Sequence, residues 1–266
     1  MKRKIALLAA AFAVAAAPAI TAAPAQAGDI TPDIVGGTPA GEPYPFVASL
    51  QYTRNGVPNS HRCGTTLIDK TWVVTAAHCV TNADGTPMPA ETFHIAIGNI
   101  DHRLGEHIKV TQVVVHPDYE TPAENNADIA LLELERAATQ KPADIGYVGV
   151  GDPVRMLGWG RTVEEDPASL SPILQELDST LLENPRCVAG DEWDITVGDI
   201  CVDIPGGDTG PCYGDSGSPV LNKDARGRWE ILGVVSRGPG TGCLNGPEVY
   251  TSTYYYEDWI WATLDA

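Results

Sequence analysis

The chain has 266 residues, with 17 lysines and arginines against 35 aspartates and glutamates and a formal net charge of −18 at pH 7. This acidic balance repels nucleic acids and anionic membranes, so the sequence argues against partners of either class. The length is enough for one large domain or for two small lobes that share a core.

The N-terminus has the order of an export signal. A basic start leads into an apolar run, Ile5–Ala17, and small residues then end in Ala27. The run is too short to cross a bilayer, and no later segment approaches the length of a transmembrane helix. We therefore predict a signal peptide over residues 1–27, a short propeptide over 28–33, and a secreted, extracellular mature chain over 34–266.

The mature chain consists of short apolar stretches, rich in β-branched residues and separated by turn-forming clusters of Gly, Pro, Asn and Asp. The clearest stretches are Phe46–Leu50, Trp72–Thr75, Val110–Val115, Ile129–Leu134, Ile231–Ser236 and Val249–Thr251. This pattern is typical of an all-β fold, either a sandwich or a barrel. Only the stretch from Tyr255 to Leu264 has apolar side chains at helical spacing, so we expect one C-terminal helix.

Two polar residues stand at the ends of predicted strands. His78 follows small residues after the stretch Trp72–Thr75, and Asp128 heads the stretch Ile129–Leu134. A carboxylate at the head of an apolar strand is expected to be partly buried, and buried carboxylates are rare unless they are paired. An imidazole N–H is a natural partner for it. A lone histidine of this kind is more often structural.

A third candidate is Ser216, within the sequence GDSGSP at Gly214–Pro219. A serine between glycines can lie on a tight, exposed turn where neighbouring N–H groups remain free. Its hydroxyl is a weak nucleophile until a base accepts the proton, and histidine has a suitable pKa near neutral pH. A short glycine–serine string of this kind is common, and alone it indicates no more than a surface turn.

Six cysteines lie in the mature chain. They are Cys63, Cys79, Cys187, Cys201, Cys212 and Cys243. An even number in an exported protein indicates disulfides, for which many connectivities are possible. The chain has no C-x-x-C or H-x-x-x-H pair, so the spacing does not indicate zinc, and we predict no metal site.

In the order His78, Asp128, Ser216, these motifs resemble the trypsin/chymotrypsin family of secreted serine proteases. Other matching motifs follow in family order: Ile34–Gly37, Cys63–Ile68, Trp72–Cys79, Gly158–Gly160, Pro247–Thr251 and Trp259–Ile260. The resemblance runs through nearly the whole mature chain. It implies a peptidase domain over 34–266, with two six-stranded antiparallel β-barrels and the active site between them.

The resemblance also implies a role for each matching residue. Ser216 would attack the scissile carbonyl of a polypeptide, His78 would take and return the proton, and Asp128 would orient His78. The backbone N–H groups of Gly214 and Ser216 would form the oxyanion hole. Ser236 matches the position that bonds the triad carboxylate and the substrate backbone. No cofactor is needed for this chemistry, and we identify no calcium-binding loop.

Further implications concern activation and disulfides. Asp215 would pair with the ammonium group of Ile34 after the propeptide is removed. The implied disulfides are Cys63–Cys79, Cys187–Cys201 and Cys212–Cys243.

The specificity pocket departs from the trypsin pattern. The usual pocket aspartate is replaced by Gly210, and Asp208 lies two residues too early. Gly238 matches a pocket position, whereas Glu248 stands where the family has glycine on the facing wall. We hypothesise that Glu248 enters the pocket and selects basic residues, because a desolvated carboxylate needs a cation. Arg237, at a position where the family usually has tryptophan, leaves the neighbouring subsites undefined.

Two other pockets remain open on this evidence. If Glu248 turns to solvent, the pocket is apolar, as in chymotrypsin or elastase. If Glu248 fills the pocket, only small residues fit.

Activation also departs from the family. Asp33 precedes Ile34, whereas zymogens of the family are usually cut after Arg or Lys. An enzyme that prefers basic residues would not cut there, so we predict an activating protease that accepts acidic residues. Polypeptide substrates and protein protease inhibitors are the other expected partners, and we expect a monomer.

Two alternative functions are weaker. A protease-like binding protein without catalysis usually lacks a triad residue or a glycine of the site, and here both are intact. An esterase of the α/β-hydrolase type would order its triad as Ser, Asp, His and would alternate strands with helices.

Overall fold

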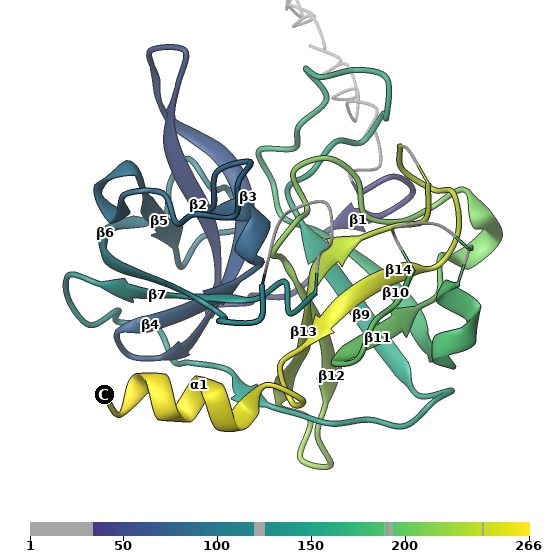
Figure 1. The fold of residues 1–266 in the computed structure, drawn as a ribbon. Helices are drawn as coiled ribbons and strands as arrows, with labels where there is room; N and C mark the ends of the chain where they lie inside the picture. The colour runs from purple at the N-terminus through teal and green to yellow at the C-terminus, as the bar shows by residue number, and fades with distance from the viewer. Residues whose placement is uncertain (1–33, 120–125, 189, 191–193, 241) are drawn as a thin grey trace, which may run out of the picture. The chain divides into compact units, whose positions relative to one another are not determined.

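Two closed barrels of antiparallel strands make up most of the described part of the chain (Figure 1). The computed structural model of the protein describes residues 34–119, 126–188, 190, 194–240 and 242–266. The predicted signal peptide and propeptide lie outside these residues.

The first barrel has six strands in the order β2-β3-β4-β7-β6-β5, and β5 pairs with β2 to close it. The bounds are β2 Val47–Arg54, β3 Val57–Asp69, β4 Trp72–Thr75, β5 His94–Ile97, β6 Glu106–Val115 and β7 Ala130–Leu134. Every residue of β4 and the first five residues of β2 are buried. Because each large apolar side chain contributes about 1.5–3 kcal/mol when fully buried, the enclosed core holds these short strands together.

The second barrel follows in the chain and closes through β9, which pairs with both β10 and β12. The bounds of its strands are β9 Pro153–Gly158, β10 Gln175–Leu182, β11 Asp199–Val202, β12 Pro219–Lys223, β13 Trp229–Arg237 and β14 Glu248–Ser252. Two short strands extend this sheet. They are β1 Thr38–Pro39, beside β10, and β8 Asp144–Ile145, parallel to β13.

The all-β prediction is confirmed, and the closed pairings decide in favour of barrels over a sandwich. The six predicted apolar stretches lie wholly or mostly in β2, β4, β6, β7, β13 and β14. The expected terminal helix is α1, Glu257–Leu264, which begins two residues later than predicted. Ile260 of α1 is fully buried in a core that also contains first-barrel side chains. The helix therefore lies beside the first barrel although it follows the second in sequence (Figure 1).

Three disulfides link the loops around the barrels, with the pairing that the resemblance implies. They are Cys63–Cys79, Cys187–Cys201 and Cys212–Cys243, which join residues 16, 14 and 31 positions apart. Closing a loop of roughly fifteen residues in this way typically contributes about 3 kcal/mol. The first ties the segment after β4 to β3, and the third ties the loop before β12 to the loop after β13.

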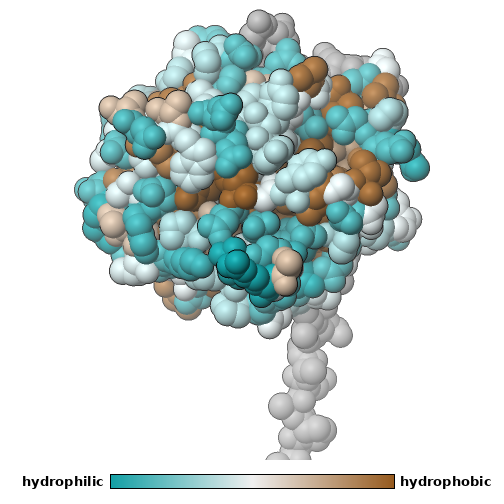
Figure 2. Space-filling model, turned by 90° about the horizontal axis from the view of Figure 1, so that it is seen from below, coloured by the Kyte–Doolittle hydropathy of each residue, from teal (hydrophilic) through white to brown (hydrophobic). Residues whose placement is uncertain are grey.

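The exterior is largely hydrophilic on the viewed face (Figure 2). Figure 2 shows one face, on which hydrophilic side chains cover most of the surface and hydrophobic side chains form separate patches. No helix among the described residues is long and apolar enough to cross a membrane.

Candidate active site

The pairing of β4 with β7 brings His78 and Asp128 together. Thr75, the last residue of β4, lies opposite Ala130, the first residue of β7. His78 follows Thr75 by three residues, within the single 3₁₀ turn η1, Ala77–Cys79, and Asp128 precedes Ala130 by two. Both side chains are thus carried by the same edge of the first barrel.

Asp128 is fully buried and holds His78 at two nitrogen atoms. Its Oδ2 accepts a hydrogen bond of 2.7 Å from Nδ1 of His78, and its Oδ1 accepts one of 2.9 Å from the His78 main-chain N–H. Burial alone would raise the pKa of Asp128, but His78 and these hydrogen bonds hold that pKa below its usual value. Because a carboxylate only accepts, the proton of the neutral imidazole is on Nδ1, and Nε2 is free to accept another.

Ser216 lies in the loop between β11 and β12 of the second barrel and is tied to the first. The main-chain N–H of Gly64 in β3 donates to the carbonyl of Ser216 over 2.8 Å. The N–H groups of Gly214 and Ser216 donate to no acceptor in the described structure. Gly214 has a φ of 104°, which a residue with a side chain rarely adopts. The loop therefore presents two free donors beside the serine.

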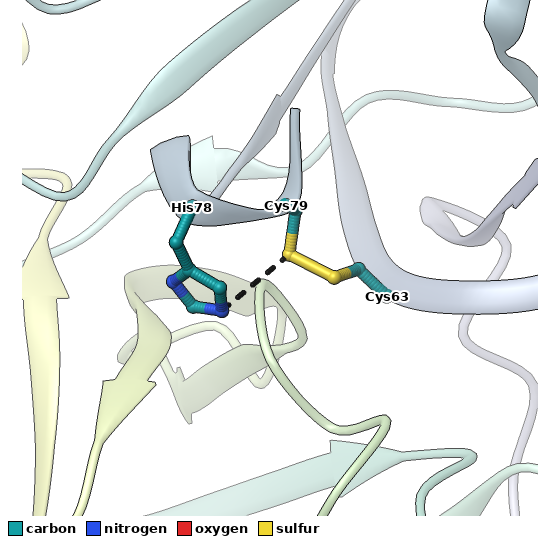
Figure 3. Close-up of side chains that lie close together, drawn as sticks. All are labelled: Cys63, His78 and Cys79. Carbon is teal, nitrogen blue, oxygen red and sulfur yellow. Dashed lines mark hydrogen bonds between the residues drawn. A yellow bond between two sulfur atoms is a disulfide. The ribbon is translucent and has the colours of Figure 1, made fainter. Parts of the chain in front are cut away.

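One cavity of about 310 Å³ brings these residues together, since His78, Gly214 and Ser216 all line it. No hydrogen bond joins Ser216 Oγ to His78 Nε2 in the described structure. Figure 3 shows the imidazole with Nε2 directed toward Cys79 Sγ, 3.8 Å away. Contacts between a nucleophile and its base are often long without substrate and shorten when substrate binds.

The Asp128 carboxylate has a third partner from the second barrel. Ser236 Oγ donates to Oδ2 of Asp128 over 2.7 Å and itself accepts a bond of 3.1 Å from Nη1 of Arg237. Arg237 is buried, and its Nη2 lies 2.7 Å from Oδ2 of Asp199, also buried. The Asp128 carboxylate is thus connected through the hydroxyl of Ser236 to the buried ion pair of Arg237 and Asp199.

Replacing Arg237 by leucine is expected to lower the free energy of unfolding by about 3–5 kcal/mol, because Asp199 is left as an uncompensated buried charge. The double variant Arg237→Leu with Asp199→Asn removes that charge and should recover much of the loss. Urea unfolding of the three proteins measures both effects. Equal stability of the single variant and the unaltered protein contradicts the assignment.

A second cavity next to Ser216, of about 130 Å³, contains Glu248 in its wall together with Ser236 and Gly238. Glu248 is only 4% exposed, so it does not turn to solvent. Its carboxylate has no hydrogen-bond or ion-pair partner among the described residues. A Cβ on Gly238 would lie 2.9 Å from both carboxylate oxygens, so glycine is needed to leave them room.

The charge of Glu248 is disfavoured where it lies. Burial, and then the negative charge of Asp215, raise the pKa of Glu248 to about 8. Gly210, the other predicted pocket residue, is not in the wall of this cavity. It forms a bridge with Val35 and packs against Ile204. The structure thus brings Glu248, Gly238 and Ser236 to Ser216 and leaves Gly210 outside the wall.

Asp215 is fully buried between glycines. Its oxygens accept bonds of 2.8 Å from the N–H of Gly160 and 2.9 Å from the N–H of Cys212. A Cβ on Gly158 or Gly160 would lie 1.8 or 2.2 Å from a carboxylate oxygen, so the two glycines make the space. Burial raises the pKa of Asp215 to about 7, although the two backbone donors act to lower it. Ile34 is fully buried as well.

Comparison with known proteins agrees with this arrangement. The sequence model of the family described as Trypsin matches residues 34–260. The chain belongs to the trypsin family. It is 34% identical, over 239 residues, to the protein named Transmembrane protease serine 11C of Mus musculus. That match covers 85% of this chain and 52% of the relative, so the chain spans about half the length of the curated protein it matches.

One residue of this trypsin-family site escaped the sequence analysis. His61 is buried, and its Nε2 lies 2.9 Å from the carbonyl oxygen of Gly214, while its Nδ1 lies 2.7 Å from Ser49 Oγ. Burial lowers the pKa of His61 to about 4, so the ring is neutral at pH 7 and donates from Nε2 to the carbonyl. His61 therefore holds the Gly214 carbonyl in place. The only feature of the sequence that could have pointed to His61 is its position two residues before Cys63.

Three residues near the site bring potential metal-ligand atoms close together, but two of these atoms are the sulfurs of a disulfide. His78 lies beside the sulfurs of Cys63 and Cys79, with the ligand atoms within 4.8 Å of one another (Figure 3). Both sulfurs belong to one disulfide. A metal requires thiolate ligands, so these three residues do not form a metal centre.

Proposed function

We propose that the protein is an exported serine endopeptidase in which Ser216, His78 and Asp128 act as nucleophile, base and orienting carboxylate. The observation that carries this proposal is the buried Asp128 carboxylate bonded to both the ring and the main chain of His78, on a cavity that Ser216 also lines. Membership of the trypsin family supports the same reaction.

The proposed reaction follows from the positions of these groups. Ser216 Oγ attacks the scissile carbonyl carbon while Nε2 of His78 takes the hydroxyl proton, and the carbonyl oxygen becomes an oxyanion. The free N–H groups of Gly214 and Ser216 belong to residues that line this cavity, and they would stabilise the charge that develops there. His78 then gives its proton to the leaving amine, which departs from the acyl-enzyme. Water repeats the steps with His78 as base and releases the second product.

The buried Asp128 supports the step in which His78 becomes charged. Its carboxylate fixes the Nδ1–H tautomer, which leaves Nε2 as the acceptor, and it stabilises the imidazolium that forms after proton transfer. The hydroxyl of Ser236 restrains the same carboxylate oxygen from the second barrel.

Export is supported by two independent features. The first 27 residues have the order of a signal peptide. All six cysteines form disulfides in the structure, which is typical of an oxidising compartment. We therefore propose that the protein is secreted and acts outside the cell.

We further propose that Glu248 selects basic side chains in the residue before the scissile bond. Its carboxylate borders the cavity beside Ser216 and lacks a cation there. An Arg or Lys side chain entering the cavity would supply the missing charge. A pocket filled by Glu248, which accepts only small residues, is the competing outcome.

The test compares peptide amides that end in Arg, Lys, Phe, Leu or Ala, assayed on the enzyme with a free Ile34 amine and on Glu248→Gly and Glu248→Gln. Arg and Lys substrates should lead, and both variants should lose that preference by about tenfold to a hundredfold, the value of one or two charge-assisted hydrogen bonds. Preference for Phe or Leu that Glu248→Gly leaves unchanged means an apolar pocket. Preference for Ala alone means a filled pocket.

The pH dependence of the same preference has a definite sign. Below its raised pKa of about 8, Glu248 is mostly protonated and neutral, whereas a cationic substrate needs it ionised. The ratio of kcat/KM for Arg over Phe substrates should therefore rise with pH and level off only above the Glu248 pKa of about 8. Taking the ratio cancels every pH effect that is common to the two substrates. A ratio that is flat with pH contradicts the role of Glu248.

Activation is proposed to occur by cleavage between Asp33 and Ile34. The buried Asp215 carboxylate has only backbone N–H donors as partners in the described structure, and the new ammonium group of Ile34 would supply a cation. Ile34 has a φ of 54°, a conformation that costs a β-branched residue about 1–3 kcal/mol. Cleavage before Ile34 would release it from that constraint.

The precursor expressed alone should remain uncleaved, because an enzyme that selects basic residues does not cut after Asp33. N-terminal sequencing over time measures this, and Asp33→Arg is the matched variant that should convert itself to Ile34. Rapid conversion of the unaltered precursor by itself would show that no separate activating protease is needed.

A further inference from the structure

The cavity that holds His78 and Ser216 is unusual for so acidic a chain. Among the described residues, its wall contains three arginines, Arg54, Arg62 and Arg161, and no aspartate or glutamate. The whole sequence has about twice as many acidic as basic residues. We call the part of the wall formed by Arg54, Arg62 and Arg161 the arginine groove.

The three guanidinium groups come from both barrels. Arg54 is exposed at the end of β2, and Arg62 is half-buried in β3. The Arg62 guanidinium lies 5.2 Å from the ring centre of Tyr52, and its Nε donates to the carbonyl of Cys79. Arg161, after β9, lies 4.6 Å from the ring centre of Tyr213. Stacking on aromatic rings fixes the planes of two of these groups without neutralising their charge.

None of these three arginines forms an ion pair in the described structure. The arginines that do are Arg103, Arg136, Arg155, Arg228 and Arg237. Arg161 donates instead to the main-chain carbonyl of Glu164, whose own carboxylate accepts a bond from the N–H of Cys243. Within the described part of the chain, no carboxylate therefore pairs with the positive charges of the arginine groove.

The arginine groove and the Glu248 cavity lie on different sides of the nucleophile. The two cavities share only Ser216 and Tyr213 among their lining residues. If the residue before the scissile bond enters the Glu248 cavity, the chain beyond the bond continues into the arginine groove. This step rests on the proposed function.

We propose that Arg54, Arg62 and Arg161 form a subsite for acidic side chains in the substrate residues that follow the scissile bond. Guanidinium groups bind carboxylates with paired hydrogen bonds. The substrate class is then a polypeptide with a basic residue before the cut and acidic residues just after it. Because the groups are partly exposed, the preference weakens as ionic strength rises.

The experiment uses three peptides that are identical up to the scissile bond and carry Glu-Glu, Gln-Gln or Lys-Lys at the second and third positions beyond it. Two series, ending in Arg or in Phe before the bond, remove any dependence on the Glu248 cavity. The Glu peptide should exceed the Gln peptide in kcat/KM by about tenfold at low salt, as expected for a few partly exposed charge pairs.

The variants are Arg62→Gln, Arg161→Gln and the triple change that includes Arg54→Gln. Each single variant should lower the Glu-over-Gln ratio by about twofold and the triple variant should bring it to about one. Arg226→Gln is the matched control. Arg226 is also an exposed arginine without an ion pair, but it lies in the turn between β12 and β13, and its replacement should leave the ratio unchanged. Thermal unfolding of every variant checks that it is folded.

A parallel binding measurement separates this proposal from the proposed function. Fluorescence anisotropy of the same peptides on Ser216→Ala protein reports affinity without cleavage. If no peptide is cleaved by the unaltered enzyme but the Glu peptide still binds more tightly, the endopeptidase proposal fails and the subsite stands. The subsite proposal is wrong if the Glu and Gln peptides have equal kcat/KM and equal affinity. It is also wrong if the preference for the Glu peptide persists in the triple variant.

Discussion

Replacing Ser216 by alanine is expected to lower kcat by about a millionfold, the loss found for the nucleophile of a serine protease with a Ser-His-Asp triad. The loss should appear in kcat with little change in KM, because the serine hydroxyl acts only in the chemical step. The variant should remain folded, since Ser216 Oγ makes no hydrogen bond in the described structure.

Ser218 supplies the matched control for this change. It belongs to the same short motif, but it is fully buried. In the part of the chain that the structure describes, it lines neither cavity at the site and its hydroxyl has no hydrogen-bond partner. Ser218→Ala should therefore keep nearly full activity. If the two alanine variants lose activity equally, the effect comes from the fold of the loop and the role of Ser216 is wrong.

Replacing Asp128 by asparagine is expected to lower kcat by about ten thousandfold. The Asp128 carboxylate accepts three bonds, from the His78 main chain, His78 Nδ1 and Ser236 Oγ. Asparagine can accept only at its oxygen, so an N–H₂ group faces either the His78 main-chain N–H or the imidazole. When it faces the imidazole, Nδ1 must accept, Nε2 carries the proton, and Ser216 loses its base.

Ser236→Ala provides the graded comparison, because it removes one of the three donors and leaves the carboxylate in place. Its effect on kcat should be well below that of Asp128→Asn. A pH–rate profile distinguishes a wrong tautomer from a lost hydrogen bond. The wrong tautomer in Asp128→Asn should change the shape of the profile, whereas Ser236→Ala should keep the shape of the unaltered protein. A loss of less than about tenfold for Asp128→Asn contradicts the orienting role, which predicts about ten thousandfold.

Sequence patterning predicted β4 and parts of five other strands from their apolar stretches, and it did not single out the others, such as the short apolar strand β5. Strand β4, with four buried residues, was predicted with its observed bounds. Strand β10, by contrast, alternates buried and partly exposed positions and includes Glu176 and Asp178. Its apolar content is too low to stand out from a loop. Barrel closure depends on pairings between distant strands, which periodicity along the chain does not encode.

For the site, short motifs predicted residues that the fold then brings together. Asp128 is 50 positions from His78 and bonds to it, as the order of the motifs implied. The same reasoning identified Arg237 only as a departure from the family. Its partner Asp199 lies 38 positions earlier, in a strand whose sequence gives no sign of a buried ion pair.

The arginine groove was also invisible in the sequence. Arg54, Arg62 and Arg161 form no basic run, and Arg161 is separated from the other two by most of the first barrel and β9. These side chains line one cavity only because the two barrels pack on either side of the loop that contains Ser216. Charge patterning along the chain detects clusters that are local, and this cluster is not.

The most direct measurement of the central proposal is labelling with a fluorophosphonate, followed by peptide mapping, on protein with a free Ile34 amine. We expect one label on Ser216, none on Ser218, and loss of labelling in His78→Ala because the hydroxyl is then without its base. If Ser216 remains unlabelled although the Ile34 amine is free, or if His78→Ala labels as fast as the unaltered protein, the proposed nucleophile and base are wrong.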